Sequence, residues 1–335
     1  MMRLVQLQNG PLRRVALVEE PRLHLLADVI SIYELAGHAL RTGGSLHRLV
    51  EEKAAGDYLD YDAVYAGRSP WRLLPAGDHP LDPAHCLVTG TGLTHLGSAK
   101  NRQQMHAAAT PGAELNDSMK MFRWGVEHGR PPAGQIGIAP EWFYKGDGSV
   151  LRAHGQPLDV PPYAEDGGEE AELAGVYMIG PDSQPHRLGM AIGNEFSDHK
   201  FEKRNYLNLA GSKLRNCALG PELVLDPGFA SVPGTVTIER DGQTIWTQEI
   251  CTGEQEMCHS LANLEHHHFK FEGHRRPGTL HVHFYGACSL SFGAGLELAN
   301  ADTMAINFTG FGRPLRNPLR ILPRSQILTT VNPLT

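Results

Sequence analysis

Hydrophobic and polar positions alternate along much of this chain, a pattern typical of β-strands with one buried face. The clearest examples are "ELAGVYMIG" (172–180) and "GMAIGNEFSDH" (189–199). Two more alternating runs flank Asp241-Gly242 and predict a hairpin, because an Asp-Gly pair favours the tight turn that joins antiparallel strands. "TLHVHF" and "TMAINF" add further strands, so the chain from Cys86 onward is predicted to be mostly β-structure.

The first part of the chain mixes two patterns. "RLVQLQNG", "RRVALVEEP" and "RLHLLA" predict short strands, and the spacing of apolar residues from Ile32 to Leu40 then predicts a helix. We expect Asp28 to cap the start of this helix, and Ser45 to cap a second, shorter one. The proline-rich run that follows (69–85) is typical of a linker.

These patterns predict an α+β protein with two parts. Residues 1–84 would form a small N-terminal α/β domain with its linker, and residues 85–335 a larger domain. Residues 95–129 read as two helical stretches around "ATPG", which could fold over a site as a lid.

Composition removes several classes of function. The chain has 335 residues and a net charge of −7, which gives no electrostatic reason to bind nucleic acid or an anionic membrane. Its apolar runs are too short for a transmembrane helix, and the start lacks the pattern of a secretory signal. Five cysteines without a CxxC spacing make a structural zinc site unlikely and favour a reduced compartment. We therefore expect a cytoplasmic protein.

Three carboxylates are the most informative candidates for chemistry. Glu170 and Glu172 stand two apart at the start of a predicted strand, so their side chains share one face, and Glu195 ends the next strand. Adjacent carboxylates repel, and one takes up a proton unless a cation lies between them. An all-oxygen cluster of this kind suits Mg²⁺, Mn²⁺ or Ca²⁺. Lys213 could hold one carboxylate electrostatically, or transfer protons if burial lowers its pKa.

Two other sites stay open as interpretations. His266, His267 and His268 in a row, with His281 and His283 on one strand face, could bind a softer metal, although consecutive histidines on a helix cannot all face one ion. The alternative is that they make hydrogen bonds within the fold or line a cavity. The glycine-rich "GTGLTHLG" lacks the spacing of a phosphate-binding loop. Ser197, Asp198 and His199 are adjacent on a predicted strand, which rules out a local catalytic triad.

The order of four short motifs resembles the fumarylacetoacetate hydrolase superfamily. They are E-x-E-L-A, N-E-x-S-D, S-K-L and L-G-P-E, and the ending "TGFGRPLRNPL" is similar to the family's closing strand. "PEWFYKGDGSV" is similar to the family segment FxKPxxS, which puts Lys145 and Ser149 on matching positions. The resemblance covers about residues 86–320.

The resemblance implies a mixed β-roll, a homodimer, and chemistry on a 2-keto acid bound to a divalent metal. By this likeness Glu170, Glu172 and Glu195 would hold Mg²⁺, with Mn²⁺ as an alternative, and Lys213 would lie beside them. Glu195 replaces the family's usual aspartate, which keeps the type of ligand but lengthens the side chain. His199 stands where many members have arginine.

The stretch "GTGLTHLGSAKNRQQMH" bears on the reaction. Hydrolases of the superfamily carry G-x-N-Y-x-x-H, whereas this stretch is more similar to the G-x-T-Y-x-x-S-x-x-A-R of its 2-keto-3-deoxy sugar-acid dehydratases. The likeness makes Thr94, Ser98, Arg102 and Lys145 candidates for binding substrate.

The function predicted on this basis is a Mg²⁺-dependent dehydratase. It would convert a 2-keto-3-deoxypentonate to 2-oxoglutarate semialdehyde and water through a metal-stabilised enolate, with Lys213, Glu170 and Glu172 as catalytic residues. The general base stays open between Lys213, a histidine of the lid and a metal-bound water. The alternatives are a hydrolase that cleaves a carbon–carbon bond of a diketo acid, such as an acylpyruvate or a 2,4-diketo-3-deoxy sugar acid, and a sensor that binds a sugar acid without turnover.

Overall fold

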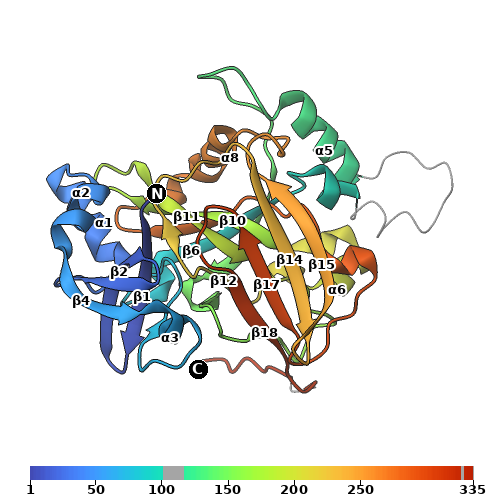
Figure 1. The fold of residues 1–335 in the computed structure, drawn as a ribbon. Coiled ribbons are helices and arrows are strands. Elements are labelled where there is room, and N and C mark those ends of the chain that lie inside the picture. The colour runs from blue at the N-terminus through green and yellow to red at the C-terminus, as the bar shows by residue number, and fades with distance from the viewer. Residues whose placement is uncertain (101–116, 326–327, 335) are drawn as a thin grey trace.

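The computed structural model describes residues 1–100, 117–325 and 328–334, and Figure 1 shows their arrangement. Within these residues a large mixed sheet and a smaller sheet make up most of the fold, and helices lie against them. Neighbouring strands pair both antiparallel, as β10 (Ala171–Ile179) with β11 (Pro185–Asn194), and parallel, as β16 (Leu280–Phe284) with β6 (Cys86–Gly92). The predicted α+β class with a mixed β-roll is therefore confirmed.

The larger sheet contains strands from both ends of the sequence. In spatial order its strands are β4 (Ala54–Asp60), β3 (Arg22–Leu26), β2 (Leu12–Glu19), β1 (Arg3–Asn9), β13 (Leu223–Val224), β11 (Pro185–Asn194), β10 (Ala171–Ile179), β16 (Leu280–Phe284), β6 (Cys86–Gly92) and β7 (Glu141–Asp147). Off this path lie β5 (Arg72–Leu73), β8 (Leu151–Arg152) and β12 (Cys217–Leu219).

The smaller sheet consists of β15 (Gln243–Thr252), β14 (Val232–Arg240), β17 (Thr303–Phe308), β18 (Leu315–Ile321) and β9 (Leu158–Val160). The helices are α1 (Ile32–Thr42), α2 (Leu46–Lys53), α3 (Tyr61–Tyr65), α5 (Asp117–His128), α6 (His199–Arg204), α7 (Leu209–Lys213) and α8 (Leu261–Phe269). No helix of the described residues is long and apolar enough to cross a membrane.

Strand β10 is more deeply buried than its alternation suggests. Every one of its residues is buried, although the pattern predicts one solvated face. The reason is that both faces are covered: Leu173 and Tyr177 belong to one hydrophobic cluster, and Ala174 and Val176 to another. A strand that is covered by a hydrophobic cluster on each face has no face exposed to solvent. The predicted strand is therefore confirmed, and the prediction that only one of its faces is buried is wrong.

The helix caps differ in part from expectation. Helix α1 begins after Ser31, whose hydroxyl accepts a hydrogen bond from the Glu34 amide at 3.1 Å. The prediction that Asp28 caps this helix is wrong, because Asp28 lies in the preceding turn with φ of 56°. Ser45 does occupy the cap position of α2, but its side chain makes no capping hydrogen bond.

The predicted hairpin between β14 and β15 is confirmed. Asp241 and Gly242 form its turn with φ of 51° and 76°, the left-handed geometry that Asp-Gly turns require. Of the predicted lid, residues 96–100 are helical and α5 forms the second helical stretch. Residues 101–116, which include Arg102, lie outside the described residues.

Residues 1–84 share a sheet and a core with the rest of the chain. Leu4 pairs with Leu223 across β1 and β13, and both belong to one hydrophobic cluster. At this junction the buried Glu222 carboxylate accepts hydrogen bonds from the Tyr61 hydroxyl at 2.8 Å and the Arg3 guanidinium at 2.9 Å. The boundary at residue 84 stays a prediction. Strands from both sides of this boundary belong to the larger sheet.

Candidate active site

Three carboxylates meet where β10 begins and β11 ends. The two strands are antiparallel, with Glu172 opposite Gly193, so Glu170 and Glu195 flank the same end of the pair. The Glu195 amide donates to the Glu170 carbonyl at 2.9 Å and continues the ladder past the strands. One carboxylate oxygen from each of Glu170, Glu172 and Glu195 lies within 4.8 Å of the others, and all three residues are buried. The structure thus brings together the three glutamates that the sequence singled out.

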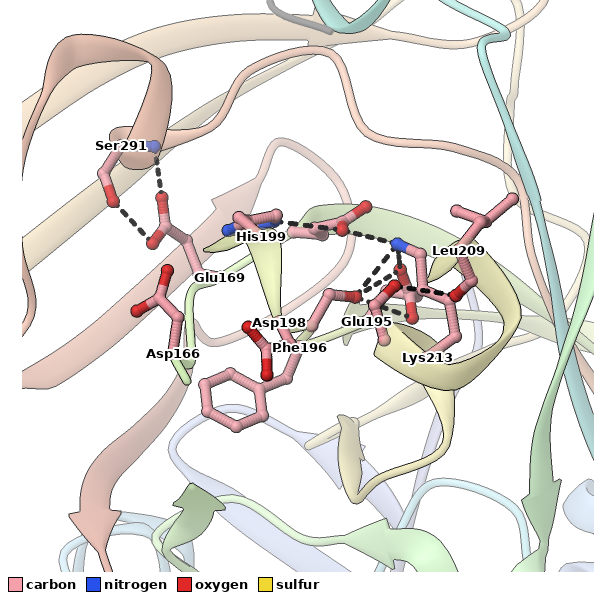
Figure 2. Close-up of polar contacts among 12 residues, drawn as sticks. Asp166, Glu169, Glu195, Phe196, Asp198, His199, Leu209, Lys213 and Ser291 are labelled. Carbon is pink, nitrogen blue, oxygen red and sulfur yellow. Dashed lines mark hydrogen bonds and ion pairs between the residues drawn. The ribbon is translucent and has the colours of Figure 1, made fainter. Parts of the chain in front are cut away.

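Two lysines lie within this cluster. The Lys213 ammonium donates to Glu170 Oε1 at 2.5 Å, to Ser197 Oγ at 2.9 Å and to Glu195 Oε2 (Figure 2). The Lys145 ammonium donates to Glu195 Oε1 at 2.5 Å and to the backbone carbonyls of Glu195 and Phe196. Lys145, predicted to bind substrate, therefore braces Glu195 in this structure.

The two lysines do not hold all three carboxylates of the cluster in ionised form. Burial opposes ionisation of Glu170, but Lys213 and a hydrogen bond from His199 outweigh it and hold the pKa of Glu170 well below its usual range. Burial, together with the charges of Glu195 and Glu170, raises the pKa of Glu172 well above its usual range. Carboxylates this close cannot all ionise without a further cation.

Lys213 is held in its charged form. Burial alone would lower the pKa of this ammonium, but the charges of Glu170 and Glu195 raise it above its ordinary value. A lysine that stays protonated orients carboxylates and does not accept a proton readily. Between the two roles open to Lys213, the structure favours electrostatic support.

His199 extends the cluster toward α6, in a role the sequence analysis did not assign. Its Nε2 lies 3.1 Å from Glu170 Oε1, and the ring is buried. Burial lowers the pKa of His199, but the bond and charge of Glu170 outweigh this effect and raise it. The only sequence signal for this position is that a basic residue, arginine, often occupies it in the superfamily that the chain resembles.

A narrow pocket opens beside Glu170. Its lining consists of Gly92, Leu93, Ser98, Glu170, His199, Glu202, Ala287 and Leu290. Ser98, predicted to bind substrate, lines this pocket together with Glu170, and its hydroxyl donates to the His95 carbonyl at 3.0 Å. The Thr94 hydroxyl instead donates to the Tyr285 carbonyl at 2.8 Å and braces that loop. The prediction for Arg102 concerns a residue outside the described part of the chain.

Glu169 is a further buried carboxylate beside the cluster, and the sequence analysis missed it. Its two oxygens accept hydrogen bonds from the backbone amide and the hydroxyl of Ser291, each at 2.7 Å (Figure 2). Glu169 is next to Glu170 in sequence but forms no part of the three-carboxylate group. Its partner is 122 positions away in sequence, so no local pattern could have revealed the contact.

His268 of α8 and His281 and His283 of β16 form a separate buried cluster, whereas His266 is exposed and His267 Nε2 lies 3.0 Å from the Gly137 carbonyl oxygen. His268 Nε2 lies 3.0 Å from His281 Nδ1, and His283 Nδ1 lies 2.8 Å from Thr89 Oγ1. Burial lowers the pKa of both His281 and His283 to about 3. Among the described residues, only Glu170, Glu172 and Glu195 bring three potential ligand atoms this close together. The structure therefore favours hydrogen bonding for the histidines.

The donor set at the three glutamates fits a hard divalent cation. Every potential ligand atom is a carboxylate oxygen, the group is buried, and the raised pKa of Glu172 shows that the lysines do not hold all three carboxylates in ionised form. Mg²⁺ and Mn²⁺ prefer such oxygen ligands. The cluster can therefore hold a metal beside the narrow pocket that Glu170 lines.

A scan against protein-family models finds no match, and a search of curated proteins finds none. Solved structures identify the fold: this chain has the architecture shared by fumarylacetoacetate hydrolase and several isomerases and dehydratases. The sequence-based resemblance to that superfamily is confirmed at the level of the fold.

Among the similar structures is a 2-keto-3-deoxyarabinonate dehydratase, at 19% identity and TM-score 0.72, over 96% of this chain and 99% of that one. A 2-keto-3-deoxy-D-arabinonate dehydratase complexed with magnesium and 2,5-dioxopentanoate matches at 20% identity and TM-score 0.70, over 96% and 100% of the two chains. Fumarylacetoacetate hydrolase from Exiguobacterium antarcticum matches at 15% identity and TM-score 0.61, over the same shares.

Proposed function

We propose that this protein is a Mg²⁺-dependent dehydratase, a hydro-lyase that removes water from a 2-keto-3-deoxy sugar acid. A 2-keto-3-deoxypentonate is the proposed substrate and 2-oxoglutarate semialdehyde, or 2,5-dioxopentanoate, the product. The carrying observation is the buried group of Glu170, Glu172 and Glu195 beside a pocket, within the fold of a dehydratase whose complex contains magnesium and 2,5-dioxopentanoate.

Each residue of the cluster has a defined role in this proposal. Glu170, Glu172 and Glu195 would hold Mg²⁺, which when bound supplies a Lewis acid for the oxygens of a 2-keto acid. Lys213 orients Glu170 and Glu195 through its hydrogen bonds, and Lys145 fixes the backbone after β11. These fixed charges lower the cost of reorganisation when negative charge develops on the substrate.

Ser98 and His199 give the pocket its polar character. Both line it next to Glu170, and both are positioned by other groups: Ser98 by the His95 carbonyl and His199 by Glu170. A hydroxyl group of a sugar acid can exchange hydrogen bonds with side chains of this kind. We propose that the polyol end of the substrate lies at this side of the pocket.

A coupled assay tests the reaction. Purified protein loaded with Mg²⁺ should convert a 2-keto-3-deoxypentonate to the semialdehyde, which an NADP⁺-dependent semialdehyde dehydrogenase would report as NADPH. Removal of the metal with EDTA should stop the reaction, and added Mg²⁺ should restore it. If protein with confirmed metal content turns over neither enantiomer of the substrate, the proposed activity is wrong.

Hydrolysis of a carbon–carbon bond in a diketo acid is the second candidate. It is kept because fumarylacetoacetate hydrolase has the same fold. Incubation with an acylpyruvate, with pyruvate release measured through lactate dehydrogenase, separates the two reactions. Binding without turnover of either substrate class would instead indicate a sensor. The proposed homodimer is tested by light scattering after size-exclusion chromatography.

A further inference from the structure

The loop from Tyr285 to Ser291 forms one wall of the pocket. It follows β16 and leads into a short 3₁₀ turn, Ser291–Ala294. Ala287 and Leu290 of this loop line the pocket opposite polar residues such as Ser98 and His199. The position of the loop therefore sets the space next to the carboxylate cluster.

The start of the loop is tied to the carboxylate cluster. The Gly286 amide donates to Glu172 Oε2 at 2.7 Å. Gly286 has a φ of 107°, and a Cβ there would lie 2.0 Å from Thr94 Oγ1, so glycine is required. Thr94 in turn donates to the Tyr285 carbonyl. Two hydrogen bonds thus fix this end of the loop beside Glu172.

The far end of the loop is tied by Glu169. Both oxygens of its carboxylate accept from Ser291, one from the amide and one from the hydroxyl, and both residues are 1% exposed. Burial raises the pKa of Glu169, and the two bonds from Ser291 oppose that rise. Hydrogen bonds to a buried carboxylate are stronger than neutral ones and fix direction as well as distance. Figure 2 shows this pair on the side of His199 away from Lys213.

The acceptors of the hydrogen bonds that hold the two ends of the loop come from one short segment. Glu169 and Glu172 flank Glu170 in the sequence, so the segment that supplies two of the three clustered carboxylates also fastens both ends of the loop. Glu169 is not in the three-carboxylate group, so a role in metal ligation does not explain its burial.

We propose that Glu169 is a positioning residue, which holds the loop from Tyr285 to Ser291 as the pocket wall and thereby limits the length of the 2-keto acid that the site accepts. The identity of the ligand rests on the proposed function, whereas the anchoring of the loop does not. Without the carboxylate, Ala287 and Leu290 lose their fixed position, and longer chains gain room.

Hydrogen–deuterium exchange tests the anchoring without any substrate. Glu169→Ala removes both acceptors, and Ser291→Ala removes only the hydroxyl. We expect peptides covering 286–291 to exchange at least about tenfold faster in Glu169→Ala, with a smaller increase in Ser291→Ala. Glu169→Gln retains an acceptor for the Ser291 amide and offers a donor to its hydroxyl, so it should stay close to the wild type.

Glu222→Ala is the matched control. Glu222 is also a buried carboxylate that accepts one backbone amide, that of Arg313, and one hydroxyl, that of Tyr61. It lies at the junction of β1 and β13, so its loss should reduce the melting temperature and leave exchange at 286–291 unchanged. If Glu169→Ala and Glu222→Ala alter this loop equally, loss of stability explains the effect and the anchoring role is wrong.

Calorimetry with Mg²⁺-loaded protein tests the effect on chain length. We expect the wild type to bind pyruvate and 2-oxobutyrate more tightly than 2-oxohexanoate. Glu169→Ala should reduce this selectivity at least about fivefold while the Kd for Mg²⁺ changes less than about threefold. Unchanged selectivity in a variant with a loosened loop would overturn the specificity role. If neither protein binds any 2-oxo acid, the proposed function fails, and the exchange experiment still decides whether Glu169 anchors the loop.

Discussion

At the scale of single residues, Glu172 shows most directly how the site lowers the stability of the metal-free fold. Its carboxylate is buried next to Glu170 and Glu195, and its pKa is raised for that reason. We expect Glu172→Gln to stabilise the metal-free protein at neutral pH by about 1–2 kcal/mol, because functional sites often hold unfavourable charges. The same variant should lose most of its affinity for Mg²⁺. Urea unfolding and calorimetry would measure the two effects, and a variant that is less stable and still binds Mg²⁺ would contradict both.

The pH dependence of the metal-free protein follows from the same residue. Folding raises the pKa of Glu172 well above its ordinary value of 4.5, so the folded state binds more protons than the unfolded state between pH 4.5 and the raised pKa. Its contribution to stability is complete below pH 4.5 and decreases as pH rises through the raised pKa. We expect this part of the pH dependence to be absent from Glu172→Gln and reduced in the Mg²⁺-bound wild type. Identical stability–pH curves for variant and wild type would refute it.

Lys213 provides the opposite case, a buried cation whose removal leaves its partners uncompensated. Glu170 and Glu195 both accept hydrogen bonds from its ammonium. Lys213→Met should destabilise the metal-free protein by about 3–5 kcal/mol, the usual cost of removing one member of a buried ion pair. Added Mg²⁺ should recover part of that loss if the carboxylates bind it. The check is urea unfolding with and without Mg²⁺, using Lys200→Met, which removes an exposed lysine paired with Glu297, as the control.

At the scale of secondary-structure elements, the pairing of β10 with β11 decides the geometry of the site. Gly193 lies opposite Glu172, and a Cβ on Gly193 would lie 2.3 Å from a Phe284 ring atom. Gly193→Ala should therefore force Phe284 out of place and cost about 1–3 kcal/mol. Gly228→Ala is the control, because no atom lies within 4 Å of a Cβ at that position. Equal melting temperatures for the two variants would show that the strand pair adapts.

The sequence predicted most elements because each of their signals is local. Alternation identified β10 and β11, and Asp241-Gly242 identified the turn of the hairpin. Its errors arose where tertiary contacts decide. Ser31 caps α1 in place of Asp28, and β10 is buried on both faces because two cores meet there.

The candidate site could likewise be predicted only where its residues carry local signals in the sequence. Glu170, Glu172 and Glu195 could be singled out because strand periodicity and the order of motifs both mark them. The contact of Glu169 with Ser291 and that of His199 with Glu170 depend on how distant segments pack. Neither has a sequence spacing that physical chemistry alone would recognise.

At the scale of the whole molecule, the N-terminal part shares the larger sheet with strands from the rest of the chain. Leu4, Val15 and Leu26 share a hydrophobic cluster with Leu223 and Val282. Residues 1–84 also contain a hydrophobic cluster of their own, which includes Val5 and Tyr61. We expect a single cooperative transition in calorimetry, because the shared sheet and the shared cluster couple the two parts. A fragment of residues 85–335 should aggregate or lack near-ultraviolet circular dichroism. A fragment that folds and binds Mg²⁺ would instead support the predicted boundary as that of an independent domain.

The loop that Glu169 anchors also contains Cys288, one of five cysteines that all lack a disulfide partner. Burial raises the pKa of the Cys288 thiol to about 12, and thiols react as thiolates. Cys288 is half-buried in the anchored loop, where its thiol reacts slowly with alkylating reagents, and an opened loop would expose it further. The rate at which iodoacetamide labels Cys288, measured by mass spectrometry, therefore reports how often the loop from Tyr285 to Ser291 opens, and no added probe is needed.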